Sequence, residues 1–300
     1  MVTQTIDRER LVEEVGHGDH LCLAFDDDAE KRRVATRYTA DGLIRGERVL
    51  YFADRSDPDT VREWLHAARI DVAGASARGQ LRVVTADETY LAPGVFDPDT
   101  MVRRLRAEIG ASLDAGYTGM RVTGEMDWAL REVPGSERLR EYETKVNEVF
   151  VGRPASAICH YDARLFGPDA LAAFDDCHPR RVELTPLYST SVLRIVPSFQ
   201  EGQRTLRVSG SVDMQTADRL EEALRATRAW PGDVRIDMRD LEFIDLTGLR
   251  VLVRTADSLD DGRRLRVEHL PEMLCKVIHL AGLDRSPALI VTSSEEVMAR

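Results

Sequence analysis

Residues 241–249 read Leu-Glu-Phe-Ile-Asp-Leu-Thr-Gly-Leu, an apolar segment that runs into a short polar turn. Beyond the turn, Leu249, Leu252 and Ala256 recur at the spacing of one helix face. We therefore expect the apolar segment to end at Asp245 and a helix to start directly after it. An aspartate at this position caps a helix well, because its carboxylate accepts hydrogen bonds from the free backbone N–H groups of the first turn.

Strands and helices alternate on both sides of this segment. The expected elements are two strands that pair antiparallel around residues 201–202, a helix, a third strand, the helix after Asp245, a fourth strand and a last helix. They cover residues 192–199, 205–210, 217–229, 234–238, 249–256, 264–268 and 272–281. Their order, β-β-α-β-α-β-α, is typical of an α/β domain.

Thr247 lies two residues beyond Asp245, at the start of the expected helix. Backbone N–H groups and the helix dipole favour negative charge at this place, so a phosphoryl group on the threonine hydroxyl would be tolerated there. The added charge, about −1.5 to −2, would disturb a partner protein docked on the same surface. Two simpler interpretations stay open: that Thr247 only helps to cap the helix, and that Asp245 is only its N-cap.

These residues resemble the STAS domains of anti-sigma-factor antagonists, whose second helix starts with an Asp-Ser-Ser-Gly-Leu motif. The resemblance covers residues 191–300, and Gly210-Ser-Val-Asp213 is similar to the family's Gly-Glu-Leu-Asp segment. It implies that a partner kinase phosphorylates Thr247. It also implies a surface that binds an anti-sigma factor, a GHKL-type serine/threonine kinase, formed by Asp213, Asp245, Leu246, Thr247 and Gly248. Leu246 stands where the family has a hydroxyl residue, and threonine replaces serine at the acceptor position.

The N-terminal part, from His20 to Pro179, alternates short apolar strands with amphipathic helices. This pattern is typical of a largely parallel sheet that is covered by helices, so we expect a second α/β domain. Its strands are expected at residues 21–25, 48–52, 81–85, 120–123 and 156–161. A helix spans residues 101–115 and ends at Gly116, a residue type that commonly follows the last turn of a helix.

Soft donor residues gather on two of these strands and at the end of the domain. His20 and Cys22 are two residues apart on the first strand, so their side chains face the same side of the sheet. The run Cys159-His-Tyr-Asp162 occupies the last strand, and Cys177-His-Pro179 closes the domain. These later donors could converge on the first pair.

Glu125, Asp127 and Trp128 follow the strand at residues 120–123, at the carboxyl edge where α/β sheets usually bind ligands. A pocket at this edge is one interpretation. The other is that Trp128 packs under a loop and that both carboxylates are solvated.

Together with Gly42-Leu-Ile-Arg-Gly-Glu-Arg48, these features resemble the MEDS sensory domain over residues 16–180. The resemblance implies a RecA/KaiC-like, mostly parallel sheet with helices on both faces, without an intact phosphate loop, that senses a small hydrocarbon derivative. His20 and Cys22 match the family's His-x-Cys motif. Later motif positions fall on Cys159, Tyr161, Asp162, His178 and Pro179.

Histidine and cysteine are also zinc ligands, but His-x-Cys with distant donors differs from the paired Cys-x-x-Cys of zinc knuckles. We therefore expect no metal and no cofactor, with zinc or a small organic ligand as the alternatives for His20, Cys22, Glu125, Trp128, Cys159, Tyr161, Asp162 and His178.

Charge and missing motifs narrow the function further. A net charge of −11 disfavours direct DNA binding, because a phosphate backbone would be repelled. No stretch approaches the roughly 20 apolar residues that cross a bilayer, and Met1–Arg10 is polar, so we expect a cytoplasmic protein without membrane contact. The chain lacks Gly-x-x-x-x-Gly-Lys-[Ser/Thr], and the acidic turn at residues 26–31 would repel phosphates. We expect no enzymatic activity.

Three hundred residues predict two domains, 1–183 and 192–300, joined by a linker at 184–191 that contains Pro186. The sequence thus indicates a signalling protein whose first domain senses a small molecule or regulator and whose second binds an anti-sigma kinase. Homodimerisation is left open. Two other functions also stay open: a nucleotide-binding phosphotransferase in the first domain, and a non-catalytic scaffold in a stress-signalling complex.

Overall fold

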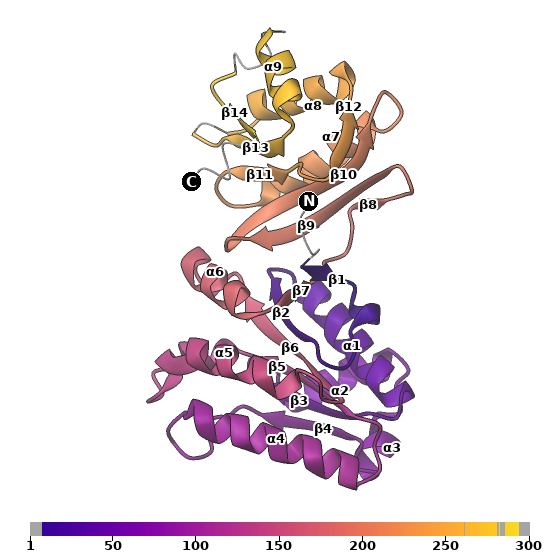
Figure 1. The fold of residues 1–300 in the computed structure, drawn as a ribbon, viewed down its shortest axis with the longest axis vertical. Coiled ribbons are helices and arrows are strands. Elements are labelled where there is room, and N and C mark those ends of the chain that lie inside the picture. The colour runs from indigo at the N-terminus through magenta and orange to yellow at the C-terminus, as the bar shows by residue number, and fades with distance from the viewer. Residues whose placement is uncertain (1–7, 261, 281, 283–285, 294–300) are drawn as a thin grey trace. The chain divides into compact units, whose positions relative to one another are not determined.

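The computed structural model describes residues 8–260, 262–280, 282 and 286–293. The chain divides into two compact units, Met1–Glu183 and Leu184–Arg300 (Figure 1). Within the described residues, no helix has both the length and the apolar character that a bilayer crossing requires.

The described residues of the N-terminal unit form a parallel sheet with the strand order β1-β7-β2-β6-β5-β3-β4. Its strands are β1 (Glu9–Arg10), β2 (His20–Phe25), β3 (Arg48–Ala53), β4 (Leu81–Thr85), β5 (Met120–Glu125), β6 (Ala155–Asp162) and β7 (Arg180–Val182). Its helices are α1 (Asp28–Ile44), α2 (Pro58–Ala67), α3 (Val72–Ala77), α4 (Pro98–Asp114), α5 (Leu139–Phe150) and α6 (Pro168–Cys177).

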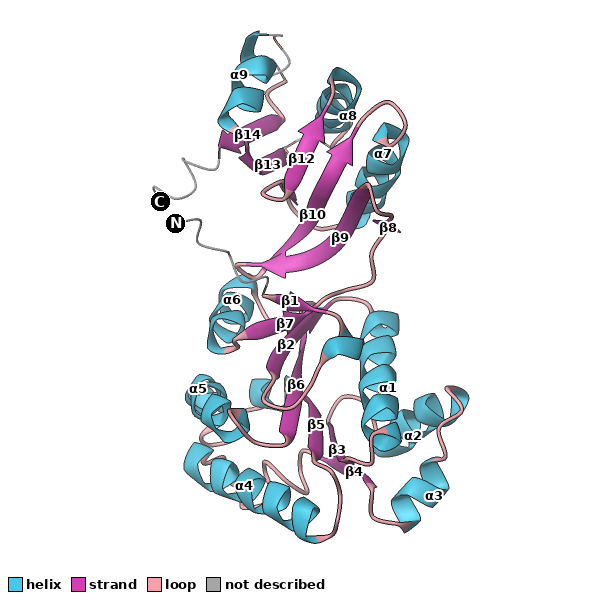
Figure 2. Ribbon diagram, turned by 45° about the vertical axis from the view of Figure 1, so that its right-hand side comes forward, coloured by secondary structure: helices cyan, strands magenta, loops and turns pink. Residues whose placement is uncertain are grey.

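Helices cover both faces of this sheet: α1, α2 and α3 lie along one face and α4, α5 and α6 along the other (Figure 2). Every residue of β5 and β6 is buried. β2 and β3 read as nearly continuous apolar runs, as expected of parallel strands that are covered on both faces. The mostly parallel sheet predicted from the sequence is confirmed. β1 and β7 were not predicted, since two or three residues carry no measurable periodicity.

The C-terminal unit has a mixed sheet with the strand order β14-β13-β11-β10-β9-β8, and β12 also pairs with β10. Its strands are β8 (Tyr188–Ser189), β9 (Leu193–Gln200), β10 (Gln203–Val212), β11 (Val234–Asp237), β12 (Leu241–Ile244), β13 (Leu265–Leu270) and β14 (Leu289–Ser293). Its helices are α7 (Ala217–Ala226), α8 (Leu246–Asp257) and α9 (Glu272–Leu280). The predicted β-β-α-β-α-β-α order is present, and β8, β12 and β14 extend it.

One boundary differs in detail from the expectation. Tyr188 pairs with Ile195, so part of the segment expected as a linker forms an edge strand of the C-terminal sheet. Residue 281, where the last helix is expected to end, and residues 294–300 lie outside the described residues.

Candidate functional site

The start of α8 is built as the sequence predicts. Asp245 is its N-cap, and the Asp245 Oδ1 atom accepts a hydrogen bond from the backbone N of Gly248 at 2.9 Å. Val212, the last residue of β10, pairs in parallel with Ile244, the last residue of β12. Asp213 and Asp245 therefore follow neighbouring strand ends at one edge of the sheet.

Gly248 allows α8 to pack closely on these two strands. A Cβ atom at this position would lie 2.7 Å from side-chain atoms of both Ile244 and Val212, closer than carbon atoms approach one another. Gly248, predicted as part of the partner surface, is buried, and it supports that surface from beneath. The close packing sets the position of Thr247, one residue earlier.

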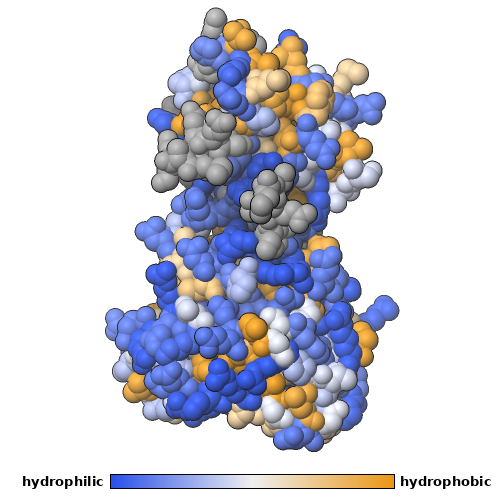
Figure 3. Space-filling view, viewed as in Figure 1, coloured by the Kyte–Doolittle hydropathy of each residue, from blue (hydrophilic) through white to orange (hydrophobic). Residues whose placement is uncertain are grey.

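We call Asp213, Met214, Phe243, Leu246 and Thr247 the strand-end surface. Three of them are apolar yet exposed: Met214 by 77%, Phe243 by 52% and Leu246 by 46%. In Figure 3, apolar surface gathers over the part of the C-terminal unit where β12, α8 and α9 lie in Figure 1. Thr247 is half-buried, and its hydroxyl has no hydrogen-bond partner among the residues that the structure describes. Backbone hydrogen bonds from Gln215 and Thr216 lower the pKa of Asp213, which keeps this surface acidic.

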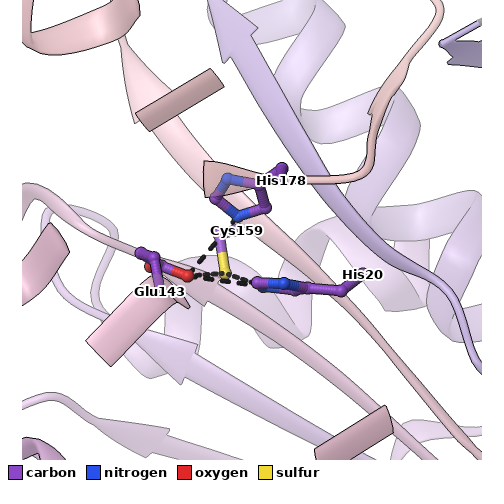
Figure 4. A group of neighbouring side chains, drawn as sticks. All are labelled: His20, Glu143, Cys159 and His178. Atoms are coloured by element: carbon purple, nitrogen blue, oxygen red, sulfur yellow. Dashed lines mark hydrogen bonds and ion pairs between the residues drawn. The ribbon is translucent and has the colours of Figure 1, made fainter. Parts of the chain in front are cut away.

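A second cluster lies in the core of the N-terminal unit. His20 on β2, Glu143 on α5, Cys159 on β6 and His178 after α6 point toward one another (Figure 4). All four are buried, and one ligand atom from each lies within 4.8 Å of the others. We call them the buried cluster.

Glu143 is the centre of the buried cluster. Its Oε2 atom lies 3.3 Å from Nε2 of His20, 3.4 Å from Nε2 of His178 and 3.6 Å from Sγ of Cys159. The Sγ atom of Cys159 is also 3.4 Å from Nε2 of His20. The Tyr161 hydroxyl donates to Glu143 Oε1 at 2.7 Å, so the carboxylate is held from both ends.

Burial and neighbours set the protonation of these groups. Burial alone would raise the pKa of Glu143, whereas His20 and His178, when their rings donate or carry a charge, and the Tyr161 hydroxyl lower it below its usual value. Burial lowers the pKa of His178 to about 4 and raises that of the Cys159 thiol. At neutral pH His178 is therefore neutral and the Cys159 thiol is protonated.

The structure brings together three of the residues that the sequence selected, His20, Cys159 and His178, with Tyr161 in contact. Cys22 pairs in register with Cys159 and is buried, but it is not a member of the buried cluster. Glu143 was missed. Its signal is a carboxylate within the apolar stripe of α5, where it alternates with Leu139, Tyr142, Val146 and Phe150, all of which are buried.

The residues at the carboxyl edge of β5 lie apart from the buried cluster. Glu125 accepts hydrogen bonds from the Lys31 ammonium group at 3.4 Å, from the Tyr51 hydroxyl, and from the backbone N of Ser56 at 2.9 Å. Glu125 and Asp127 are buried, so the interpretation of two solvated carboxylates is wrong. Trp128 is buried against aromatic rings, which agrees with the interpretation that it packs in the core.

The rings beside Trp128 are Tyr90, 5.0 Å away between centroids, and Phe96, 4.7 Å away. Asp162 forms an ion pair with Arg164 and is not a member of the buried cluster. An open groove of about 440 Å³ lies between β3, β4 and α4, with Phe52, Leu105 and Tyr142 in its wall, and none of the sequence-selected ligand residues lines it.

Asp127→Asn is expected to flatten the pH dependence of folding between pH 4 and 6. Burial raises the pKa of Asp127 from 3.8 to about 6; Glu125, Asp162 and Asp54 add to this, while Lys31 opposes it. Because the folded state then binds a proton more tightly than the unfolded state, stability falls as pH rises through this window and stays lower above it. Urea unfolding of wild type and variant at several pH values measures the difference. Glu132→Gln, an exposed control, should leave the profile unchanged.

Two family models match the chain. The MEDS model, the methanogen/methylotroph DcmR sensory domain, matches residues 19–179, and a STAS domain model matches residues 195–292. The transcriptional repressor DcmR of Methylorubrum extorquens is 25% identical over 178 residues, 55% of this chain and 61% of the repressor. The chain thus spans less than two thirds of that relative's length.

The C-terminal unit is similar in sequence to anti-sigma-factor antagonists. The anti-sigma-F factor antagonist RsfB of Mycobacterium tuberculosis is 32% identical over 101 residues, 33% of this chain and 83% of that protein. Among solved structures, a KaiC-like protein of Pyrococcus horikoshii is 13% identical with a TM-score of 0.42, over 63% of this chain and 89% of its own. DcmR and RsfB are both regulators, which indicates a regulatory role for this chain. The chain belongs to the MEDS family through residues 19–179 and to the STAS anti-sigma-factor antagonists through residues 195–292.

Proposed function

We propose that this protein is a cytoplasmic anti-sigma-factor antagonist that binds an anti-sigma factor of the GHKL-type kinase class through its strand-end surface. Phosphorylation of Thr247 by that partner ends the binding, and the MEDS domain senses a small ligand. The observation that carries the proposal is the half-buried residue Thr247 at the start of α8, on the same surface as the exposed side chains of Leu246, Phe243 and Met214.

A phosphate on Thr247 should affect partner binding without unfolding the domain. The first turn of α8 presents backbone N–H groups, so a phosphate there is compatible with the folded domain. A docked partner would cover Leu246 and Phe243 and would have to strip water from the dianion. The phosphate charge on Thr247 therefore leaves the domain folded but lowers its affinity for the partner.

The turn after β2 supports a role without nucleotide chemistry. Asp27 caps α1 with its own carboxylate, which accepts from the backbone N of Ala29 at 2.9 Å and occupies the place that a phosphate loop offers to an anion. Lys31 is buried and bonded to Ser56 and Glu125. These contacts favour a sensory domain over a phosphotransferase.

Thr247→Glu is expected to weaken binding to the cognate anti-sigma factor about 100-fold or more, because an unpaired charge buried in an interface costs about 3 to 5 kcal/mol. Thr247→Ala should bind as wild type does. Affinity capture from native lysate identifies the kinase, and titration of the purified kinase measures the three dissociation constants.

Gln203→Glu is the matched control, since it adds one negative charge to an exposed position at the opposite end of β10. It should leave the affinity unchanged. Equal binding by Thr247→Glu and Thr247→Ala would defeat the proposal.

A further inference from the structure

Both histidines of the buried cluster present a lone pair to Glu143. The Nδ1 atom of His178 lies 2.7 Å from the backbone oxygen of Phe174, which can only accept, so Nδ1 carries the proton. In the neutral ring, Nε2 is then an acceptor, and it lies 3.4 Å from an oxygen of the Glu143 carboxylate, another acceptor. Two acceptors in the core face each other across a distance that a cation would bridge.

His20 is held in the same tautomer by a different partner. Its Nδ1 atom is 2.7 Å from Oδ1 of Asn147, and Nδ2 of Asn147 donates to the backbone oxygen of Cys177 at 2.7 Å. This second bond orients the amide, so that Oδ1 accepts from His20 and Nε2 of His20 faces Glu143. Ligating histidines in metal sites are oriented in this way, by an acceptor bound to the other ring nitrogen.

Four of the six distances between the ligand atoms are close to the edges of a tetrahedron around one metal ion, and all six lie within 4.8 Å. Zinc bonds of about 2.0 to 2.2 Å to nitrogen and oxygen and about 2.3 Å to sulfur give nitrogen–oxygen edges of about 3.3 to 3.5 Å and edges to sulfur of about 3.5 to 3.6 Å. The nitrogen–oxygen distances here are 3.3 and 3.4 Å, and those to Cys159 Sγ are 3.4 and 3.6 Å.

We propose that His20, Glu143, Cys159 and His178 bind one divalent first-row transition-metal ion, and that the ion is zinc. Two neutral imidazoles, a thiolate and a carboxylate form a set of nitrogen, sulfur and oxygen donors that zinc accepts. Binding forms a metal–sulfur bond and releases the thiol proton of Cys159 to solvent. The two negative ligands then cancel the charge of the ion, which a buried site requires.

The site ties four elements together and is closed to solvent. Its ligands come from β2, α5, β6 and the end of α6, and each is buried. Four protein ligands leave no open position for substrate or water, as in structural zinc sites. The ion thus fixes α5 and α6 to the sheet. This inference is independent of Thr247 and of the partner kinase.

Elemental analysis of the full chain, purified without a metal-affinity tag from zinc-containing medium, tests the site. We expect one zinc per chain in wild type and at least a fivefold loss in Cys159→Ala. Cys22→Ala is the matched control, because it removes a buried thiol from the position paired with Cys159 and should keep the zinc. Asn147→Leu removes the acceptor of His20 and should weaken zinc affinity about 10- to 100-fold.

A second measurement needs no variant. Wild type that has been stripped by a chelator should take up one Co²⁺ and show the visible bands of a tetrahedral ion together with thiolate-to-cobalt charge transfer. Less than a tenth of an equivalent of metal without cobalt uptake would overturn the proposal, as would equal zinc in wild type and in folded Cys159→Ala.

Discussion

Glu47→Leu is expected to lower the free energy of unfolding of the N-terminal unit by about 3 to 5 kcal/mol, because it leaves a buried guanidinium group without its counter-ion. Arg121 is fully buried, and its Nε atom donates to Glu47 Oε2 at 2.5 Å. Its other nitrogens donate only to the backbone oxygens of Tyr38 and Val15. Neither carbonyl carries the full charge that Glu47 supplies.

Amide hydrogen exchange at β5 measures the change, since it separates the two units of the chain. Glu47→Leu combined with Arg121→Met should recover most of the loss, because an apolar pair needs no counter-ion. Asp59→Leu breaks an exposed pair with Arg62 and should cost about 1 kcal/mol at most. A cost for Glu47→Leu as small as that of Asp59→Leu would show that the buried pair is not required.

This ion pair also explains a motif that the sequence offered without a physical reason. Gly42 and Glu47 belong to the run that resembles the MEDS family. A Cβ atom at Gly42 would lie 2.7 Å from Cδ of Arg121, so the glycine makes room for the same side chain that Glu47 neutralises. Arg121 itself lies on β5, far along the chain, and its place could not be predicted from local periodicity.

Local patterns predicted the elements well. The continuous apolar runs at β2 and β3 and the helical stripe of α4 are properties of neighbouring residues, so they are visible in the sequence. The β12–β10 pairing is not local: four residues, Leu241–Ile244, with two exposed side chains, carry too weak an alternation to be recognised as a strand. The strands β12 and β10 are adjacent only because the fold brings Ile244 beside Val212.

In the buried cluster, too, some residues could be selected from the sequence and one could be found only from the fold. His20, Cys159 and His178 were selected because their residue types are rare and suited to ligands. Glu143 was not, since carboxylates are common and usually solvated on helices. Only the fold reveals that its side chain points into the core, between the two histidines. Leu246 and Thr247 of the strand-end surface were selected because they belong to one short motif, whereas Met214 and Phe243 were not, since only the fold shows that they are exposed beside it.

Gly210→Ala is expected to destabilise the C-terminal unit by about 2 to 5 kcal/mol and to disrupt the strand-end surface. Gly210 has a φ of +89°, and a Cβ atom there would lie 2.2 Å from the backbone oxygen of Val192. Left-handed backbone costs an alanine about 1 to 2 kcal/mol, and the overlap with a paired strand adds about 1 to 3 kcal/mol. The overlap cannot be relieved by a rotamer change, because the contacting atom belongs to the backbone.

Substitution of Gly210 should disrupt the strand-end surface because β10 changes its pairing partner near this residue. Residues 205–207 of β10 pair with β11, whereas residues 210–212 pair with β12 after a register shift between Gly210 and Ser211. Gly232→Ala is the control, since its φ is +70° and nothing lies within 4 Å of the added Cβ, so it should cost about 1 to 2 kcal/mol. Hydrogen exchange at β10 measures both variants. If Gly210→Ala costs no more than Gly232→Ala, the backbone at the register shift adapts to the alanine, and the positions of Asp213 and Thr247 do not depend on Gly210.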